Sequence, residues 1–94
     1  MIRVALLEIE IMLPGCRTLK EKRHRLRGLK DRLGSAGGCV VVESGRQDNL
    51  QRAQWSVVAA AVDAASVDRL LRSAEDRIER EIDGVVVSSS RQWL

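Results

Sequence analysis

The sequence predicts an α+β fold, a ferredoxin-like β-α-β-β-α-β sandwich whose four-stranded antiparallel sheet carries two helices on one face. In two long segments hydrophobic residues alternate with a period of two, as in strands that bury one face. In two other segments hydrophobic residues recur with the period of a helix, and each segment begins at a capping residue. Both halves of the chain have the order strand, helix, strand, and right-handed crossovers then give the split βαβ arrangement. The expected strands are 2–13, 39–44, 52–62 and 85–94, and the expected helices are 18–33 and 63–82.

The first expected strand has one apolar face and one mixed face. Because side chains alternate along a strand, residues two apart lie on the same side. The face expected to be buried carries Ala5, Leu7, Ile9 and Ile11, and the mixed face carries Val4, Leu6, Glu8 and Glu10. Pro14-Gly15 then ends the strand.

The first expected helix begins at Thr18, whose hydroxyl is predicted to accept a hydrogen bond from the amide of Glu21. In such a capping box the carboxylate of Glu21 reaches back to the start of the helix. Gly34 is expected to end the helix, and a glycine-rich turn follows. The expected buried stripe is Leu19, Leu26, Leu29 and Leu33, with Lys22 on the same side.

The second half of the chain repeats this order. A turn at 45–49 leads into the third strand, Asp63 is the expected cap of the second helix, and Asp83-Gly84 leads to the last strand. The residues expected to face inward are Ala53, Trp55, Val57, Ala59 and Ala61 on the strand, and Val67, Leu70, Leu71, Ala74, Ile78 and Ile82 on the helix. The ion pairs expected at i,i+4 spacing on the outer surface of the helix are Asp68–Arg72, Asp76–Arg80 and Arg77–Glu81.

Composition bounds the class of protein. The 94 residues suffice for one domain, 1–94, and are 45% hydrophobic and 31% charged, as in a globular chain. Trp55 and Trp93 are the only aromatic residues, which disfavours recognition by stacking nucleobases on aromatic rings. No segment resembles a signal peptide or a membrane span, so a cytoplasmic protein without a membrane partner is expected. Cys16 and Cys39 form no metal-ligand pattern, and neither a metal nor a cofactor is expected.

Positive charge is concentrated in the first half of the chain. Residues 1–52 hold eleven Lys and Arg against six Asp and Glu, whereas residues 53–94 hold five against seven. Four cations of the first helix fall in one stripe beside its apolar face, namely Lys20, Arg23, Arg27 and Lys30. Because like charges repel, the stability of the helix alone does not explain this stripe. A row of cations suits the phosphates of a nucleic acid.

The stripe is also compatible with two roles that involve no nucleic acid. Long Lys and Arg side chains cover the flanks of a core and keep a protein soluble. The stripe can instead meet an acidic protein partner. Val4, Leu6 and Val58 on the uncovered sheet face form a small patch that suits a homodimer. On the same face Glu10 is expected to pair with Arg52 across adjacent strands.

A separate anion site is expected where the first strand leads into the first helix. Backbone amides and Arg17 can bind one phosphate or carboxylate there. The turns at 46–49 and 83–84 are expected at the same end of the molecule, which gives a remote alternative, an acylphosphatase-like hydrolase that uses Arg17 and Asn49. The acylphosphatase loop pattern GxVQGVxFR is missing from the chain, so no catalytic residue is predicted.

Two segments resemble one known family. "LPGCRTLKEKRHRLRGLKDRL" is similar to the start of the YlxP-like bacterial proteins, a domain family of unknown function, and "QDNLQRAQWSVVAAAVDAASVDRLL" resembles the middle of those proteins. The residues that match the family motifs are Leu19, Lys20, Glu21, Lys22, Arg23, Asp48, Gln51, Arg52 and Ala53. The resemblance implies a ferredoxin-like fold and no activity, because the family has no established one. In many bacteria its genes lie beside those for translation initiation factor two and ribosome-binding factor A.

The sequence therefore predicts a small, non-catalytic protein that binds RNA or the small ribosomal subunit and is accessory to ribosome assembly or translation. The basic stripe supports a polyanion as the partner, and only the resemblance supports the ribosome. The main alternative is a homodimeric interaction module that binds an acidic protein. The residues expected to bind nucleic acid are Lys20, Arg23, Arg27, Lys30 and Arg17.

Overall fold

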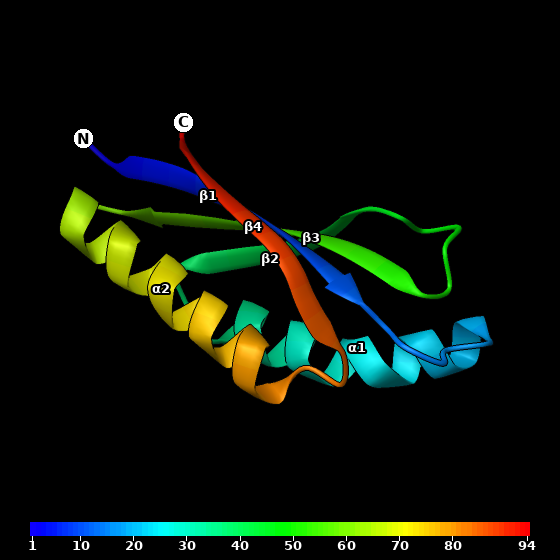
Figure 1. Ribbon diagram of the computed structural model, residues 1–94. Helices are drawn as coiled ribbons and strands as arrows, with labels where there is room; N and C mark the ends of the chain where they lie inside the picture. Colours follow the sequence, from blue (N-terminus) through cyan, green and yellow to red (C-terminus); the bar gives the residue numbers. More distant parts are fainter.

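The computed structural model describes residues 1–94 and has two layers, a sheet and a pair of helices that cover one of its faces (Figure 1). The four strands form one antiparallel sheet in the order β2-β3-β1-β4. This arrangement confirms the predicted fold class. The elements are β1 (Arg3–Met12), α1 (Leu19–Ser35), β2 (Cys39–Gly45), β3 (Arg52–Ala61), α2 (Ala64–Glu81) and β4 (Val85–Trp93).

The core lies between the sheet and the helices and is built from aliphatic side chains around one tryptophan. The predicted inward face of β1 is confirmed, since none of its four residues is more than 3% exposed. On β3 the alternation is confirmed from Ala53 to Ala59, and Ala61 is partly buried. Trp55 is fully buried, and its indole Nε1 is a buried nitrogen without a hydrogen-bond partner.

The buried stripe of α1 differs from the prediction at the first turn. Leu19 is 45% exposed, whereas Lys22 is 2% exposed and takes the buried position one turn later. Leu26, Leu29 and Leu33 are buried as predicted. The apolar residue that begins the helix therefore contacts solvent, and a lysine takes its place in the buried stripe.

The end of α1 also differs from the prediction. Gly34 lies inside the helix, which continues to Ser35. Gly37 and Gly38 have φ angles of 85° and 79°, in the left-handed region that favours glycine. The helix therefore ends at Ser35, one residue after Gly34, and the left-handed turn at Gly37 and Gly38 then leads into β2.

The second helix agrees closely with its prediction. The carboxylate of Asp63 accepts a hydrogen bond from the amide of Ser66 at 2.7 Å, as an N-cap residue does. Of the six residues of the predicted stripe, Val67, Leu71, Ala74 and Ile78 are buried and Leu70 and Ile82 are partly buried. Two of the three predicted ion pairs form, Asp68–Arg72 and Arg77–Glu81. The third is wrong, because Arg80 donates to the backbone carbonyl of Asp76 rather than to its carboxylate.

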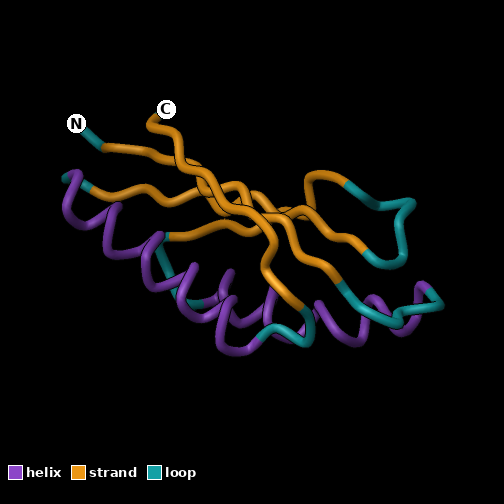
Figure 2. The backbone as a smooth tube through the Cα atoms, viewed as in Figure 1, coloured by secondary structure: helices purple, strands orange, loops and turns teal.

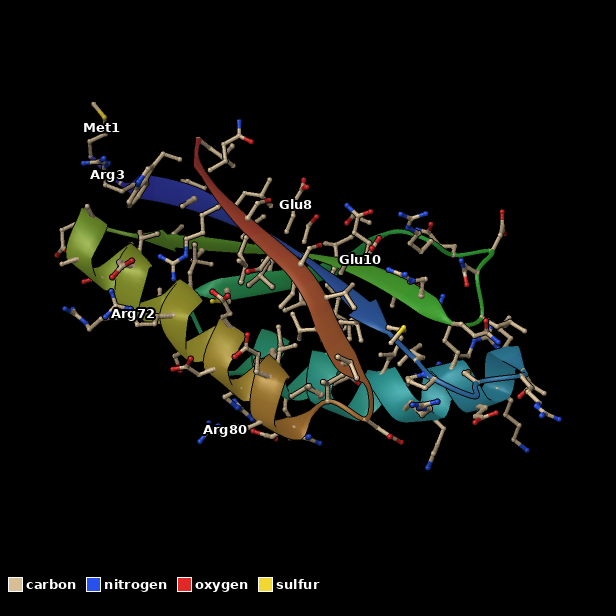
Figure 3. All side chains as sticks on the ribbon, in the orientation of Figure 1. Met1, Arg3, Glu8, Glu10, Arg72 and Arg80 are labelled. Carbon is tan, nitrogen blue, oxygen red and sulfur yellow. The ribbon has the colours of Figure 1, made fainter.

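The other face of the sheet is not covered by helices. Glu8 and Glu10 project from β1 on this side, away from α1 and α2 (Figure 3). Glu10 pairs with Arg52 at 2.9 Å, as predicted, and also with Arg46 at 2.8 Å. No helix of the protein has the length and apolar character needed to cross a membrane.

Replacement of Glu10 by glutamine is expected to lower stability at neutral pH and to have little effect in acid. The hydrogen bond from Arg46 is the main cause that lowers the pKa of Glu10, and Arg52 acts in the same direction. A lowered pKa in the folded state contributes stability above the ordinary pKa of glutamate, about 4.3, and that contribution is lost as the pH falls through the folded-state pKa. Urea denaturation of both proteins from pH 7 to pH 3 measures the difference. A difference that is constant over this range would contradict the assignment.

Candidate functional site

The cations of the predicted stripe lie along one side of α1 and have no anionic partner. Lys20, Arg23 and Arg27 are exposed and Lys30 is partly buried. None of the four has a carboxylate oxygen within 4.0 Å, and none donates a side-chain hydrogen bond within the protein. The side chain of Arg17, just before the helix, is likewise exposed and unpaired. These five residues are the ones that the sequence predicted for a polyanion.

The other three cations of the helix have structural roles. Arg25 donates to the backbone carbonyls of Pro14 and Asp83, both at 2.9 Å, and so joins two loops to the helix. Its guanidinium group also lies 3.9 Å from the carboxylate of Glu21, one helical turn earlier. Arg32 pairs with Glu81 of α2 at 3.3 Å. The seven cations of the helix thus divide into three that hold the fold together and four that are free.

Lys22 is the third structural cation and connects α1 to the loop between β2 and β3. Its ammonium group donates to the carbonyl oxygens of Arg46 at 2.9 Å and Asn49 at 2.8 Å. It also lies 3.4 Å from the carboxylate of Glu43 on β2. A buried ammonium group is tolerated where its donors and its charge are compensated. Here two carbonyl oxygens accept hydrogen bonds, and the carboxylate of Glu43 pairs with the charge.

A groove runs between α1 and β2 beside this buried lysine. We call it the α1–β2 groove; its volume is about 360 Å³, within the range of small-molecule sites. Free cations of the stripe form the helix side, and Glu43 and Gln47 form the strand side. The full lining is Leu19, Lys22, Arg23, Leu26, Arg27, Lys30, Asp31, Glu43 and Gln47.

Sequence reasoning missed the strand side of this groove, although a signal was present. Along β2, Cys39, Val41 and Glu43 alternate on one side, opposite Ala59, Val57 and Trp55 of β3. Since Trp55 faces inward, Glu43 faces the helix layer as well. Asp31 of α1 also lines the groove, on the helix side.

The loops at the end of the sheet come together as expected, but their polar groups contact one another. The loop after β1 and the loop between β2 and β3 lie at the same end of the molecule (Figure 2). The side-chain oxygen of Asn49 accepts from the amide of Gln51 at 2.9 Å, and the side chain of Gln51 donates to the carbonyl of Cys16 at 3.4 Å. The carboxamide of Asn49 is therefore engaged inside its own loop.

The start of α1 is capped by its own side chains. The Thr18 hydroxyl accepts from the amide of Glu21 at 3.0 Å, as predicted. The carboxylate of Glu21 accepts from the amide of Arg17 at 3.1 Å, one residue earlier than in the usual capping box. The amide of Arg17, which was expected to bind an external anion, thus has an internal one.

The motif residues of the second family-like segment, Asp48, Gln51, Arg52 and Ala53, contribute mainly to structure. Arg52 pairs with Glu10 on the open face, Gln51 joins two loops, and Ala53 is fully buried beneath the helices. Asp48 is exposed in the loop. Of the motif residues, Lys22 therefore joins α1 to the β2–β3 loop, and Gln51 joins that loop to the loop before α1.

No three His, Cys, Asp or Glu side chains gather as a metal-binding cluster. Cys16 and Cys39 are both free thiols, and Cys16 is fully buried in the core. Burial raises the pKa of the Cys39 thiol, so this cysteine is protonated at neutral pH.

Comparison with protein families gives one match of broad extent. Residues 4–91 match the family described as "Protein of unknown function (DUF503)". The match begins in β1 and ends in β4, so it includes both helices and every residue of the α1–β2 groove. No significant match is found among curated proteins.

Solved structures are similar in fold and distant in sequence. A C-terminal segment of the α subunit of aIF2 from Pyrococcus abyssi is 18% identical with a TM-score of 0.56, over 99% of this chain and 49% of that one. Protein YJCS is 10% identical with a TM-score of 0.55, over 95% and 96% of the two chains. The designed protein Foldit4 is 13% identical with a TM-score of 0.55, over 100% and 97%. At such identities the likeness shows the fold alone, and this chain spans about half the length of the aIF2 segment.

Proposed function

This chain belongs to the DUF503 family of proteins of unknown function, and we propose that it is a non-catalytic protein that binds RNA through α1. One observation carries the proposal. Lys20, Arg23, Arg27 and Lys30 share one side of the helix and have no carboxylate partner, while the remaining cations of α1 are all paired. Free cations in a row suit the phosphates of a nucleic acid, because they release its condensed counterions when they bind.

The proposal has a quantitative consequence for salt. If all four cations contact phosphates, the logarithm of affinity falls with a slope of about −3 against the logarithm of salt concentration. Affinity then falls by roughly 50- to 150-fold between 50 and 200 mM salt. A partner held mainly by apolar contacts has no such dependence.

We further propose that the RNA is ribosomal and belongs to the small subunit. The support is the resemblance of the two motif segments to the YlxP-like proteins, whose genes lie beside those of translation factors. The likeness to the aIF2 segment is too distant in sequence to add to this support.

Neutralisation of two cations of the stripe, Arg23→Gln with Arg27→Gln, is expected to weaken RNA binding by about tenfold or more at 50 mM salt. It should also reduce the salt slope by about 1.5, because two phosphate contacts are lost. Fluorescence anisotropy with a labelled fragment of 16S ribosomal RNA at several salt concentrations measures both quantities.

The chain offers a matched control on its other helix. Arg69 and Arg80 of α2 are exposed, lack carboxylate partners and have the same charge. Arg69→Gln with Arg80→Gln changes the net charge equally but leaves α1 intact, so RNA binding should change by less than twofold. If both double variants weaken binding equally, only the net charge matters and the stripe is not a site.

A second candidate function rests on the open face of the sheet. Val40 and Val42 of β2 are 60% and 48% exposed, and the register places Val40, Val58 and Leu6 in one row across three strands. Exposed apolar residues in a row suit a homodimer that joins two open faces. A chain that sediments as a monomer at high micromolar concentration would exclude this candidate.

A further inference from the structure

We infer that the α1–β2 groove holds one unstacked guanine of the bound RNA strand, an inference that rests on the proposed RNA binding. The free cations Arg23, Arg27 and Lys30 line the helix side of the groove together with Asp31, and the carboxylate of Glu43 lines the strand side. A surface that only tracked phosphates would need no acceptor opposite its cations. The groove thus combines donors on one wall with an acceptor on the other.

The acceptor is a carboxylate in a fixed position. Glu43 projects inward from β2 opposite Trp55, and its exposure is 30%. One carboxylate oxygen lies 3.4 Å from the ammonium group of Lys22, and neither oxygen accepts a hydrogen bond from a protein group. An ionised carboxylate has about four acceptor positions, so Glu43 has free capacity toward the groove.

Guanine is the base that matches both walls. Its Watson–Crick edge presents two adjacent donors, N1–H and the N2 amino group, to a carboxylate. Its other edge presents the acceptors O6 and N7, which arginine binds with two parallel hydrogen bonds. Adenine and cytosine each place an acceptor next to their amino group, and uracil has a single donor between two acceptors. A carboxylate therefore repels one position of each of these three bases.

The remaining lining suits the other parts of a nucleotide. Leu26 is buried and Leu19 is half exposed, so together they offer an apolar surface to the face of a base. Recognition of an unstacked base is the usual way in which proteins read single-stranded RNA. Cations farther along the stripe then contact the flanking phosphates.

The test uses the wild-type protein and three RNA octamers, each with uridines around one central guanosine, inosine or adenosine. The guanosine octamer is expected to bind about tenfold more tightly than the adenosine octamer, which is the discrimination of one bidentate contact. Inosine lacks only the N2 amino group and should fall between the two. Affinities that agree within twofold for all three octamers would overturn the inference.

A substitution of Glu43 tests whether the preference for guanosine arises in the α1–β2 groove. Glu43→Gln keeps an oxygen for Lys22 but replaces a paired acceptor by one acceptor and one donor, so the preference for guanosine should disappear. Binding of the adenosine octamer should not weaken, because the carboxylate that repels its acceptor is gone, and the salt slope should stay the same, because the stripe cations are intact. A variant that retains the full preference for guanosine would place the base elsewhere and overturn the assignment. If the variant does not fold, the affinities of the wild-type protein for the inosine and guanosine octamers decide whether the N2 amino group of guanine is recognised.

The outcomes separate this inference from the function on which it rests. Equal, salt-dependent binding of all octamers leaves RNA binding intact and removes guanine recognition. No binding of any octamer or of the 16S fragment at 50 mM salt removes both.

Discussion

Replacement of Lys22 by methionine is expected to lower the free energy of unfolding by about 2–4 kcal/mol. Methionine preserves much of the apolar stem of lysine, so the packing of α1 is retained and the loss is mainly electrostatic. The carbonyl oxygens of Arg46 and Asn49 lose their donor, and Glu43 loses its counterion. Because Lys22 is only 2% exposed, water cannot easily replace the ammonium group.

Urea denaturation followed by circular dichroism measures this change. The matched control is Lys20→Met, two residues earlier on the same helix, where the side chain is exposed and unpaired. That substitution should change stability by less than about 0.5 kcal/mol. If the two variants lose equal stability, Lys22 does not hold the β2–β3 loop.

Reversal of all four stripe charges, with glutamate at Lys20, Arg23, Arg27 and Lys30, is expected to abolish RNA binding. The four attractive contacts become repulsive, so affinity at 50 mM salt should fall by at least about a hundredfold. In a native lysate at low salt, the tagged wild-type protein should sediment with the small ribosomal subunit or its precursors. The variant should stay at the top of the sucrose gradient.

Two controls make the sedimentation result specific. Circular dichroism must show that the reversed variant folds, and treatment of the lysate with ribonuclease should release the wild-type protein. A complex that survives ribonuclease but not charge reversal would indicate an acidic protein as the partner. A wild-type protein that stays at the top of the gradient would contradict the ribosomal assignment.

The sequence predicted the fold because strand and helix periods are local properties. The alternation in β1 and the spacing of Val67, Leu71 and Ile78 in α2 depend only on which residues face one layer. The helical projection also put Lys22 beside the leucines of α1. What Lys22 contacts there could not be predicted, because its partners Arg46 and Asn49 are more than twenty residues away in a loop.

The sequence predicted the α1 side of the candidate site but not the β2 side. The positions of the four stripe cations on α1 follow from the angle of about 100° between successive residues of a helix. In the structure these four cations have no carboxylate partner. The opposite wall depends on how β2 pairs with β3, which places Glu43 beside Trp55. That register follows from the turn between the strands and from the packing of α1, so local pattern alone does not fix it.

The inward position of Glu43 has a consequence for solubility. β2 is an edge strand, and its consecutive valines favour the addition of a strand from another molecule. An inward-facing charge on an edge strand and a local irregularity in its register both oppose such addition, and β2 has a register shift between Glu43 and Gly45. The pairing of Lys22 with Glu43 therefore allows a charged residue at this position without unfolding the domain. In this way one partly buried ion pair helps to keep separate copies of the chain from joining edge to edge into filaments.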